Sequence, residues 1–141
     1  MAEKKNTLPE ELAGNPNTPP ETLRELVQNE NIDIRMTVAA NSGIPLDLAE
    51  SLMQEDDQWL RMNVARYSPH LEILKKLAED EVAWVREAVA KNPNTPTDLL
   101  EMLYVPIGFG RYKLNGKEDD KDADVYIKTD AGKYVKDGDD A

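Results

Sequence analysis

Apolar residues return at a regular spacing over the part of the chain that ends near residue 103. Two sets of positions carry the pattern. The first set consists of Leu26, Leu52, Leu77 and Leu103. In the second set an apolar residue precedes an arginine, and the pairs are Ile34-Arg35, Leu60-Arg61 and Val85-Arg86. Successive arginines are 26 and 25 residues apart, and a fixed period of this size predicts stacked supersecondary units rather than one globular core.

Each unit opens on a proline-containing phrase that predicts a turn. The phrase Asn-Pro-Asn-Thr-Pro occupies residues 15–19 and returns at 92–96, with a degenerate copy at 41–45. Proline fixes its own backbone and restricts the residue before it, so this phrase does not fit inside a helix. We expect Thr18 and Thr95 to cap helices that start at the following proline. The expected first helices span 19–28, 45–54 and 96–103.

A polar break and a second apolar stretch follow in each unit. The breaks occupy residues 29–31, 55–57 and 79–81 and are acidic or rich in amides. After each break two apolar residues lie four positions apart, which predicts a second short helix. These pairs are Ile34/Val38, Leu60/Val64 and Val85/Val89. The third unit is one residue shorter at its start, where we interpret His70 as a turn residue.

Four features together resemble the leucine-rich repeat variant family. They are the turn phrase, the column of leucines, the pairs of an apolar residue and an arginine, and the Val-Ala pairs at 38–39, 64–65 and 89–90 that end each unit. The resemblance covers about residues 12–103. It implies a mainly α fold, a right-handed α-solenoid of about 25-residue two-helix repeats, either α/3₁₀ or α/α, that is similar to HEAT-like repeats. We expect a helical domain over 1–104, with an N-terminal cap at 6–14 and repeats at 15–40, 41–66, 67–91 and 92–104. Solenoids serve many purposes, so this resemblance does not give the activity.

Beyond residue 104 the repeat stops and the pattern changes to that of short strands. Asn115-Gly116 is a strong hairpin-turn dipeptide, and a second turn signal lies at 130–132 between the apolar runs 125–127 and 134–135. We expect a small antiparallel β unit over 105–141, with two or three strands as a hairpin or meander. Residues 117–124 should form a solvated loop, and 136–141 should fray. So small a sheet needs a packing partner, and the last helix is the obvious one, so the unit either caps the solenoid or binds a partner.

Charge and composition narrow the classes of function. The formal net charge is −11, from 28 acids and 17 bases, which argues against direct nucleic-acid binding. No apolar run is long enough to span a membrane, and residues 1–5 do not resemble a signal peptide, so a cytoplasmic location is expected. One relative of the family carries an iron–sulfur cluster on a cysteine-rich segment, but this chain has no cysteine.

The sequence offers little support for catalysis or for a cofactor. His70 is the only histidine, and it lacks neighbours at metal-ligand spacing. The alternating acids Asp120, Asp122 and Asp124 resemble part of a calcium loop, but the glycine and distal glutamate of an EF-hand are missing. No nucleophile motif or phosphate-binding glycine loop is present. We therefore expect no enzyme, no cofactor and no metal site.

The arginine column is the most regular polar feature of the chain. An acid precedes each arginine by five residues, which gives the pairs Glu30/Arg35, Asp56/Arg61 and Glu81/Arg86. We expect a structural ladder, in which each guanidinium pairs with that acid or with loop carbonyls of a neighbouring unit and holds the stack in register. Ligand binding by these arginines is the less favoured alternative.

Two tryptophans occupy equivalent places just before their arginines. They are Trp59 and Trp84, and the first unit has Asp33 at that position. Large aromatics at a variable repeat position either fill the core between helices or anchor a partner on an exposed face, and the sequence leaves both readings open. The candidate protein-binding residues are Asp57, Gln58, Trp59 and Trp84.

The favoured function is a non-enzymatic protein-interaction module or scaffold. An extended acidic solenoid surface would meet a protein partner with a basic patch. One alternative is an acidic mimic of nucleic acid that inhibits a DNA- or RNA-binding enzyme. Another is a structural component of a larger assembly that pairs through the C-terminal β unit. The identity of the partner and the oligomeric state are not encoded in the sequence.

Overall fold

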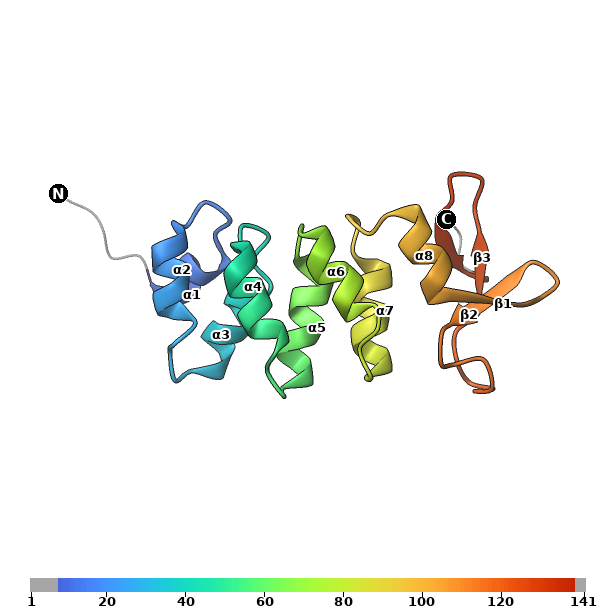
Figure 1. The fold of residues 1–141 in the computed structure, drawn as a ribbon, viewed down its shortest axis with the longest axis horizontal. Helices are drawn as coiled ribbons and strands as arrows, with labels where there is room; N and C mark the ends of the chain where they lie inside the picture. The colour runs from blue at the N-terminus through green and yellow to red at the C-terminus, as the bar shows by residue number, and fades with distance from the viewer. Residues whose placement is uncertain (1–7, 139–141) are drawn as a thin grey trace.

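The computed structural model of the chain describes residues 8–138, and these form helices followed by a small sheet (Figure 1). Within this range the eight α-helices are α1 (Pro9–Gly14), α2 (Pro20–Leu26), α3 (Ile32–Ala39), α4 (Leu46–Met53), α5 (Gln58–Tyr67), α6 (Leu71–Leu77), α7 (Ala83–Lys91) and α8 (Thr97–Leu103). The four strands are β1 (Tyr104–Gly108), β2 (Arg111–Leu114), β3 (Tyr126–Lys128) and β4 (Tyr134–Lys136). The predicted class, mainly α with a small C-terminal antiparallel β unit, is confirmed.

The helices follow one another along the long axis of the molecule, and the sheet lies at the C-terminal end (Figure 1). Helices α1, α3, α5 and α7 pack each against the next in that series. Helices α4 and α6 also pack against each other. The molecule is therefore elongated.

A thin apolar core runs through the helices and into the sheet. Both sets of regularly spaced apolar residues from the sequence are buried, as are Tyr104, Leu114 and Tyr126 of the sheet, and all of them belong to one cluster. Burial of one leucine or valine side chain contributes about 1.5–3 kcal/mol. The apolar positions thus provide the packing for helices of only six to ten residues, which would not be stable alone.

The prediction that Thr18 and Thr95 cap the next helix is wrong. The N-cap residues are Pro19 and Pro96, without a side-chain cap, so α2 and α8 begin one residue later than expected. The threonine hydroxyls instead point back to the preceding helix: Thr18 Oγ1 donates to the Leu12 carbonyl and Thr95 Oγ1 to the Val89 carbonyl, each at 2.6 Å. Carbonyls in the last turn of a helix lack an intrahelical donor, and the threonines supply one.

Two buried asparagines tie each turn to an earlier one. Asn41 Nδ2 donates to the carbonyls of Ala13 and Asn15, at 2.8 and 3.0 Å. Asn92 Nδ2 donates in the same way to the carbonyls of Ala65 and Ser68, at 2.9 and 2.8 Å. The side-chain oxygen of each asparagine also accepts a hydrogen bond from the backbone two residues on. Each amide thus bridges two backbone carbonyls, which connects turns that are far apart in the sequence.

The sheet has four strands, not the two or three expected, in the order β1-β2-β3-β4 with every neighbour antiparallel. The missed strand is β1, which starts at Tyr104 directly after α8, at the edge of the expected helical domain. Fraying from residue 136 is also contradicted, because Lys136 ends β4 and the Asp137 amide donates to the Val125 carbonyl at 2.7 Å. Residues 139–141, like the expected cap residues 6 and 7, lie outside the described range.

Candidate functional site

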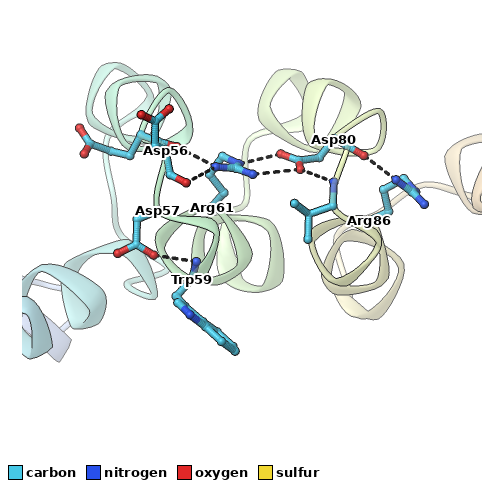
Figure 2. A network of polar contacts seen from close by, with 8 residues as sticks. Asp56, Asp57, Trp59, Arg61, Asp80 and Arg86 are labelled. Atoms are coloured by element: carbon cyan, nitrogen blue, oxygen red, sulfur yellow. Dashed lines mark hydrogen bonds and ion pairs between the residues drawn. The ribbon is translucent and has the colours of Figure 1, made fainter.

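The two tryptophans form a contacting pair on one face of the helices. Trp59 in the first turn of α5 and Trp84 in the first turn of α7 have ring centroids 5.2 Å apart and ring planes inclined at 45°. Their exposed fractions are 48% and 46%, which makes them half-exposed rather than core residues. In Figure 2 the Trp59 indole points away from the polar network around Arg61. Half of each indole surface is thus available to a binding partner.

The pair lines an open cleft between α5 and α7, which we call the aromatic cleft. Its volume is about 510 Å³. Besides the tryptophans, it is lined by Met62, Asn63, Arg66, Tyr67, Glu87, Ala88 and Lys91. The apolar lining comes from equivalent faces of two packed helices, because side chains four positions apart lie on one helix face. A partner side chain could bury apolar surface here without any rearrangement of the backbone.

Asp57 and Gln58, the other two candidate binding residues, lie at the start of α5 and outside the lining of the aromatic cleft. The Asp57 carboxylate is the N-cap of α5 and accepts a hydrogen bond of 2.9 Å from the Trp59 amide (Figure 2). Gln58 is the first residue of the helix and is half-buried. Asp57 therefore fixes the backbone that carries Trp59.

The three column arginines share one contact. Nη1 of Arg35, Arg61 and Arg86 donates to the carbonyl six residues earlier, at 2.6, 2.8 and 2.6 Å. Each guanidinium thereby closes the loop that precedes its own helix. These contacts join each arginine to its own polar break rather than to that of a neighbouring unit.

The acid that pairs with Arg61 is Asp80. Its carboxylate accepts hydrogen bonds from Nε at 2.8 Å and from Nη2 at 3.2 Å, and these bonds raise the pKa of Arg61 above its ordinary value. Asp56 contributes its backbone carbonyl to Arg61, at 3.0 Å. Within residues 8–138 the carboxylates of Glu30, Asp56 and Glu81 form no ion pair within 4.0 Å, and all three side chains are exposed.

Arg86 joins the helices to the sheet. Its Nη2 donates to the Asn115 carbonyl in the turn after β2, at 3.0 Å. Its Nε is buried and has no acceptor among the described residues. The equivalent atom of Arg61 bonds to Asp80, but α7 is followed by α8 and the sheet, which offer no carboxylate to Arg86 Nε. Arg61 and Arg86 therefore differ because Arg86 lies close to the point where the helices give way to the sheet.

His70 and the Asp120–Asp124 loop have local structural contacts. His70 is the N-cap residue of α6, and its Nε2 lies 2.8 Å from the Ile44 carbonyl in the preceding turn. Asp120 accepts a hydrogen bond from the Asp122 amide at 2.9 Å. Across the described residues, no group of three or more His, Cys, Asp or Glu side chains is arranged to hold a metal ion.

Sequence reasoning missed the basic residues near the aromatic cleft. Arg66 and Lys91 lie in the last turns of α5 and α7 and line the cleft together. Their spacing of 25 residues repeats that of the arginine column, and this periodicity could have identified them.

No family model, no curated protein and no solved structure matches this chain. In the part of the chain that the structure describes, no helix has the length and apolar character needed to cross a membrane. The functional argument therefore starts from the residues of the cleft.

Proposed function

We propose that the chain is a non-enzymatic protein-binding module whose helices form a right-handed α-solenoid and whose partner binds at the aromatic cleft. The observation that carries the proposal is the pair of half-exposed, contacting tryptophans on adjacent equivalent helices. Tryptophan, tyrosine and arginine are the residue types that dominate the energetics of protein interfaces, and the cleft contains all three.

Equivalent hydrogen bonds support the repeat organisation. The side chains of Asn31 and Asp57, the N-cap residues of α3 and α5, each accept a bond of 2.9 Å from the backbone amide two residues on. The arginine contacts, the threonine contacts and the buried asparagines recur in the same way. Recurrence of the same bonds at a spacing of about 25 residues is what a solenoid of two-helix units would produce.

The geometry of the tryptophans favours recognition over a role in packing. An indole is a large apolar group, and leaving two of them half in water forgoes burial that a core position would provide. The N-cap at Asp57 and the contact between the rings fix both indoles before binding. A fixed anchor loses little conformational entropy when the partner arrives, which favours affinity.

The loops that precede α5 and α7 carry the charge that would meet a basic patch on the partner. Glu55, Asp56, Glu79 and Glu81 are exposed there, and Trp59 and Trp84 follow within a few residues. Complementary charge around an apolar anchor accelerates encounter and disfavours incorrect partners. We therefore propose that the partner presents basic side chains to these loops.

Affinity capture from native cytosol tests the proposal when the wild-type chain is compared with two variants. Trp59→Ala removes an anchor of the cleft, whereas Met102→Ala removes an equally exposed apolar side chain on α8, away from it. We expect a specific protein that the wild type and Met102→Ala retain and that Trp59→Ala loses. A partner retained by all three chains, or no specific partner, would contradict the proposal.

Intrinsic fluorescence gives an independent measurement, because Trp59 and Trp84 are the only tryptophans in the chain. Binding of a tryptophan-free segment of the captured partner should shift their emission to shorter wavelength and protect them from quenching by acrylamide.

Urea denaturation checks that the Trp59→Ala variant is folded. Truncation of a half-exposed indole should lower the free energy of unfolding by about 1–2 kcal/mol, less than the roughly 3–5 kcal/mol expected for a buried one.

A second candidate function is edge-to-edge assembly through the sheet. Strands β1 and β4 each have one neighbour, so each leaves an edge without a partner strand in the described structure. However, β4 has only three residues and lies between Lys133 and Lys136, and short, lysine-flanked edges are those that resist pairing. Sedimentation at increasing concentration tests this candidate: a monomer throughout would argue against self-assembly through the sheet.

A further inference from the structure

A second cleft, next to the aromatic one, has a charge opposite to that of the chain as a whole. It has a volume of about 590 Å³ and lies between the C-terminal ends of α5 and α7, α8 and the sheet. We call it the cationic cleft. Its charged lining residues are Arg66, Lys91, Lys133 and Lys136, and no carboxylate is among the residues that line it. Acids outnumber bases 28 to 17 in the sequence, so composition alone does not explain this lining.

The two clefts are adjacent, because Arg66 and Lys91 line both of them. The aromatic cleft contributes one acid, Glu87, and that carboxylate lies 3.3 Å from Lys91 Nζ. An extended segment could thus pass from the tryptophans, over Arg66 and Lys91, to the lysines of the sheet.

Two of the four cations lack an acidic neighbour. Lys91 and Lys136 have carboxylates at 3.3 and 3.6 Å, from Glu87 and Asp124. For Arg66 and Lys133, no carboxylate of residues 8–138 lies within 4.0 Å. The guanidinium of Arg66 lies over the Tyr67 ring, 5.2 Å from its centroid, which orients it without neutralising it.

The charge at helix ends accounts for only two of the four cations in the cationic cleft. Arg66 and Lys91 lie in the last turns of α5 and α7, where a cation offsets the partial negative charge of the helix end. Lys133 and Lys136 come from β4 and its preceding turn, and no helix end of their own accounts for them. Their convergence on the same cleft requires another explanation.

We propose that the two clefts together bind an acidic peptide segment of the protein partner, with an apolar side chain against Trp59 and Trp84 and two or more carboxylates against Arg66 and Lys133. This inference rests on the proposed function and adds the chemistry of the bound segment. The segment has a direction: its basic or neutral end lies toward the acidic loops before α5 and α7, and its acidic end lies toward the sheet.

The overall charge favours a peptide over a nucleic acid. A single strand carries a phosphate at every nucleotide, and the net charge of −11 and the exposed acids Glu55 and Asp56 would repel the part outside the cationic cleft. A peptide can confine its carboxylates to the few residues that face the cations. Tyr104 and Tyr126 also line the cationic cleft but are nearly buried, so charge makes the distinction between the two ligands.

The test begins with selection of random twelve-residue peptides displayed on phage against the full-length chain. We expect the selected peptides to combine an aromatic or long aliphatic residue with at least two Asp or Glu residues. The best one, synthesised with a fluorescein label, is then titrated by fluorescence anisotropy. The double variant Arg66→Glu/Lys133→Glu should weaken its binding at least tenfold, and raising the salt should weaken binding to the wild type.

The matched control is Lys75→Glu/Lys76→Glu on α6. Both lysines are exposed, and the change in net charge equals that of the cleft variant. The control should bind the peptide within about twofold of the wild type, apart from a small long-range effect of charge. If Arg66→Glu/Lys133→Glu fails to give the wild-type far-UV circular dichroism, the neutral pair Arg66→Gln/Lys133→Gln replaces it, with an expected loss of at least fivefold.

Several results would overturn the inference. These are selection of basic peptides or of no consensus, equal weakening by the cleft and control variants, tighter binding of a labelled twenty-nucleotide oligothymidine than of the peptide, or a dimer that the cleft variant abolishes. Failure here is distinguishable from failure of the proposed function. A captured partner lost on Trp59→Ala but retained by Arg66→Glu/Lys133→Glu would leave the protein-binding function standing and exclude the acidic segment.

Discussion

The carboxylate of Asp80 receives two hydrogen bonds from the guanidinium of Arg61, from Nε at 2.8 Å and from Nη2 at 3.2 Å (Figure 2). Both side chains are nearly buried, with 11% and 8% of their surface exposed. Asp80 also accepts from the Val82 amide, and its carbonyl accepts from Arg86. Asp80 thus connects two successive column arginines, although the sequence did not single it out.

Substitution of Arg61 should destabilise the fold strongly. Arg61→Ala leaves the nearly buried Asp80 carboxylate without its cation and the Glu55 and Asp56 carbonyls without a donor, so we expect a loss of roughly 3 kcal/mol in the free energy of unfolding. The stability of Arg61→Lys should lie between those of Arg61→Ala and the wild type, because an ammonium group carries the charge but cannot reproduce the forked contact. Urea denaturation followed by circular dichroism measures both.

Arg24→Ala is the control for that experiment. Arg24 pairs with Asp47 at 3.0 Å, but both side chains are largely exposed, and exposed ion pairs contribute little. The urea concentration at which half of the Arg24→Ala variant is unfolded should stay close to that of the wild type. Similar losses for Arg24→Ala and Arg61→Ala would show that burial does not set the strength of these pairs.

Asn92 should be another position of high sensitivity. It is buried, its amide donates to two carbonyls, and its oxygen accepts from the Asn94 amide. Asn92→Ala leaves these groups unsatisfied, and we expect a loss of about 2–3 kcal/mol in urea denaturation. Asn15, which opens the same sequence phrase, is exposed, and its side chain accepts one bond, from the Asn17 amide, so Asn15→Ala should cost well under 1 kcal/mol. Equal costs would refute this distinction within the phrase.

The sequence carried enough information to place the helices, because their apolar positions repeat and prolines mark the turns. It could not identify the partner of Arg61, since residues 79–81 are all acidic and only the three-dimensional path of the loop decides which carboxylate points inward. Thr18 and Thr95 were misassigned for a related reason. The hydroxyl of a threonine before a proline can donate to a carbonyl of the previous helix, or its oxygen can accept from an amide of the next one, and sequence alone does not separate these contacts.

The candidate site was predicted in part. The equivalence of Trp59 and Trp84 followed from the period, but their exposure depends on how far α5 and α7 approach each other. The cationic cleft was not predicted, because Lys133 and Lys136 belong to a different kind of structure and reach Arg66 only through the docking of the sheet. Contacts between a repeat and a non-repeating unit have no periodic signature.

Docking of the sheet should depend on Gly116. Its φ is +91°, and a Cβ atom there would lie 2.5 Å from Arg86 Nη2. That nitrogen donates to the Asn115 carbonyl, and Nη1 of the same guanidinium donates to the Asp80 carbonyl. Gly110 has a φ of +71° but open space around it, so Gly110→Ala should cost only the backbone strain, about 1 kcal/mol. Gly116→Ala should cost roughly 1–2 kcal/mol more, because the Arg86 contact is displaced.

A double-variant cycle in urea tests the explanation for Gly116. If the additional cost comes from Arg86, then it should disappear in the Arg86→Ala background, where Gly116→Ala and Gly110→Ala should become similar. A difference that persists without the guanidinium would assign the effect to the turn itself.

Alkaline pH should destabilise the junction between α8 and the sheet through Tyr104. This side chain is 3% exposed and stacks on Tyr134 with ring centroids 4.3 Å apart. Burial raises the pKa of its phenol above the ordinary value of 10.0, because the phenolate is poorly solvated there. The folded state therefore holds the proton more tightly than the unfolded chain. Its contribution to stability is complete below pH 10 and falls as the pH rises above that value, by at most about 1.4 kcal/mol per pH unit.

Melting temperatures of Tyr104→Phe and wild type between pH 8 and pH 11.5 test this linkage. The variant has no phenol to ionise at that position, so its melting temperature should fall less steeply above pH 10, while the lysines titrate alike in both chains. Tyr67→Phe, at an exposed position of α5, should keep the slope of the wild type. If instead all three chains lose stability in parallel, ionisation of Tyr104 is not what limits the fold at high pH.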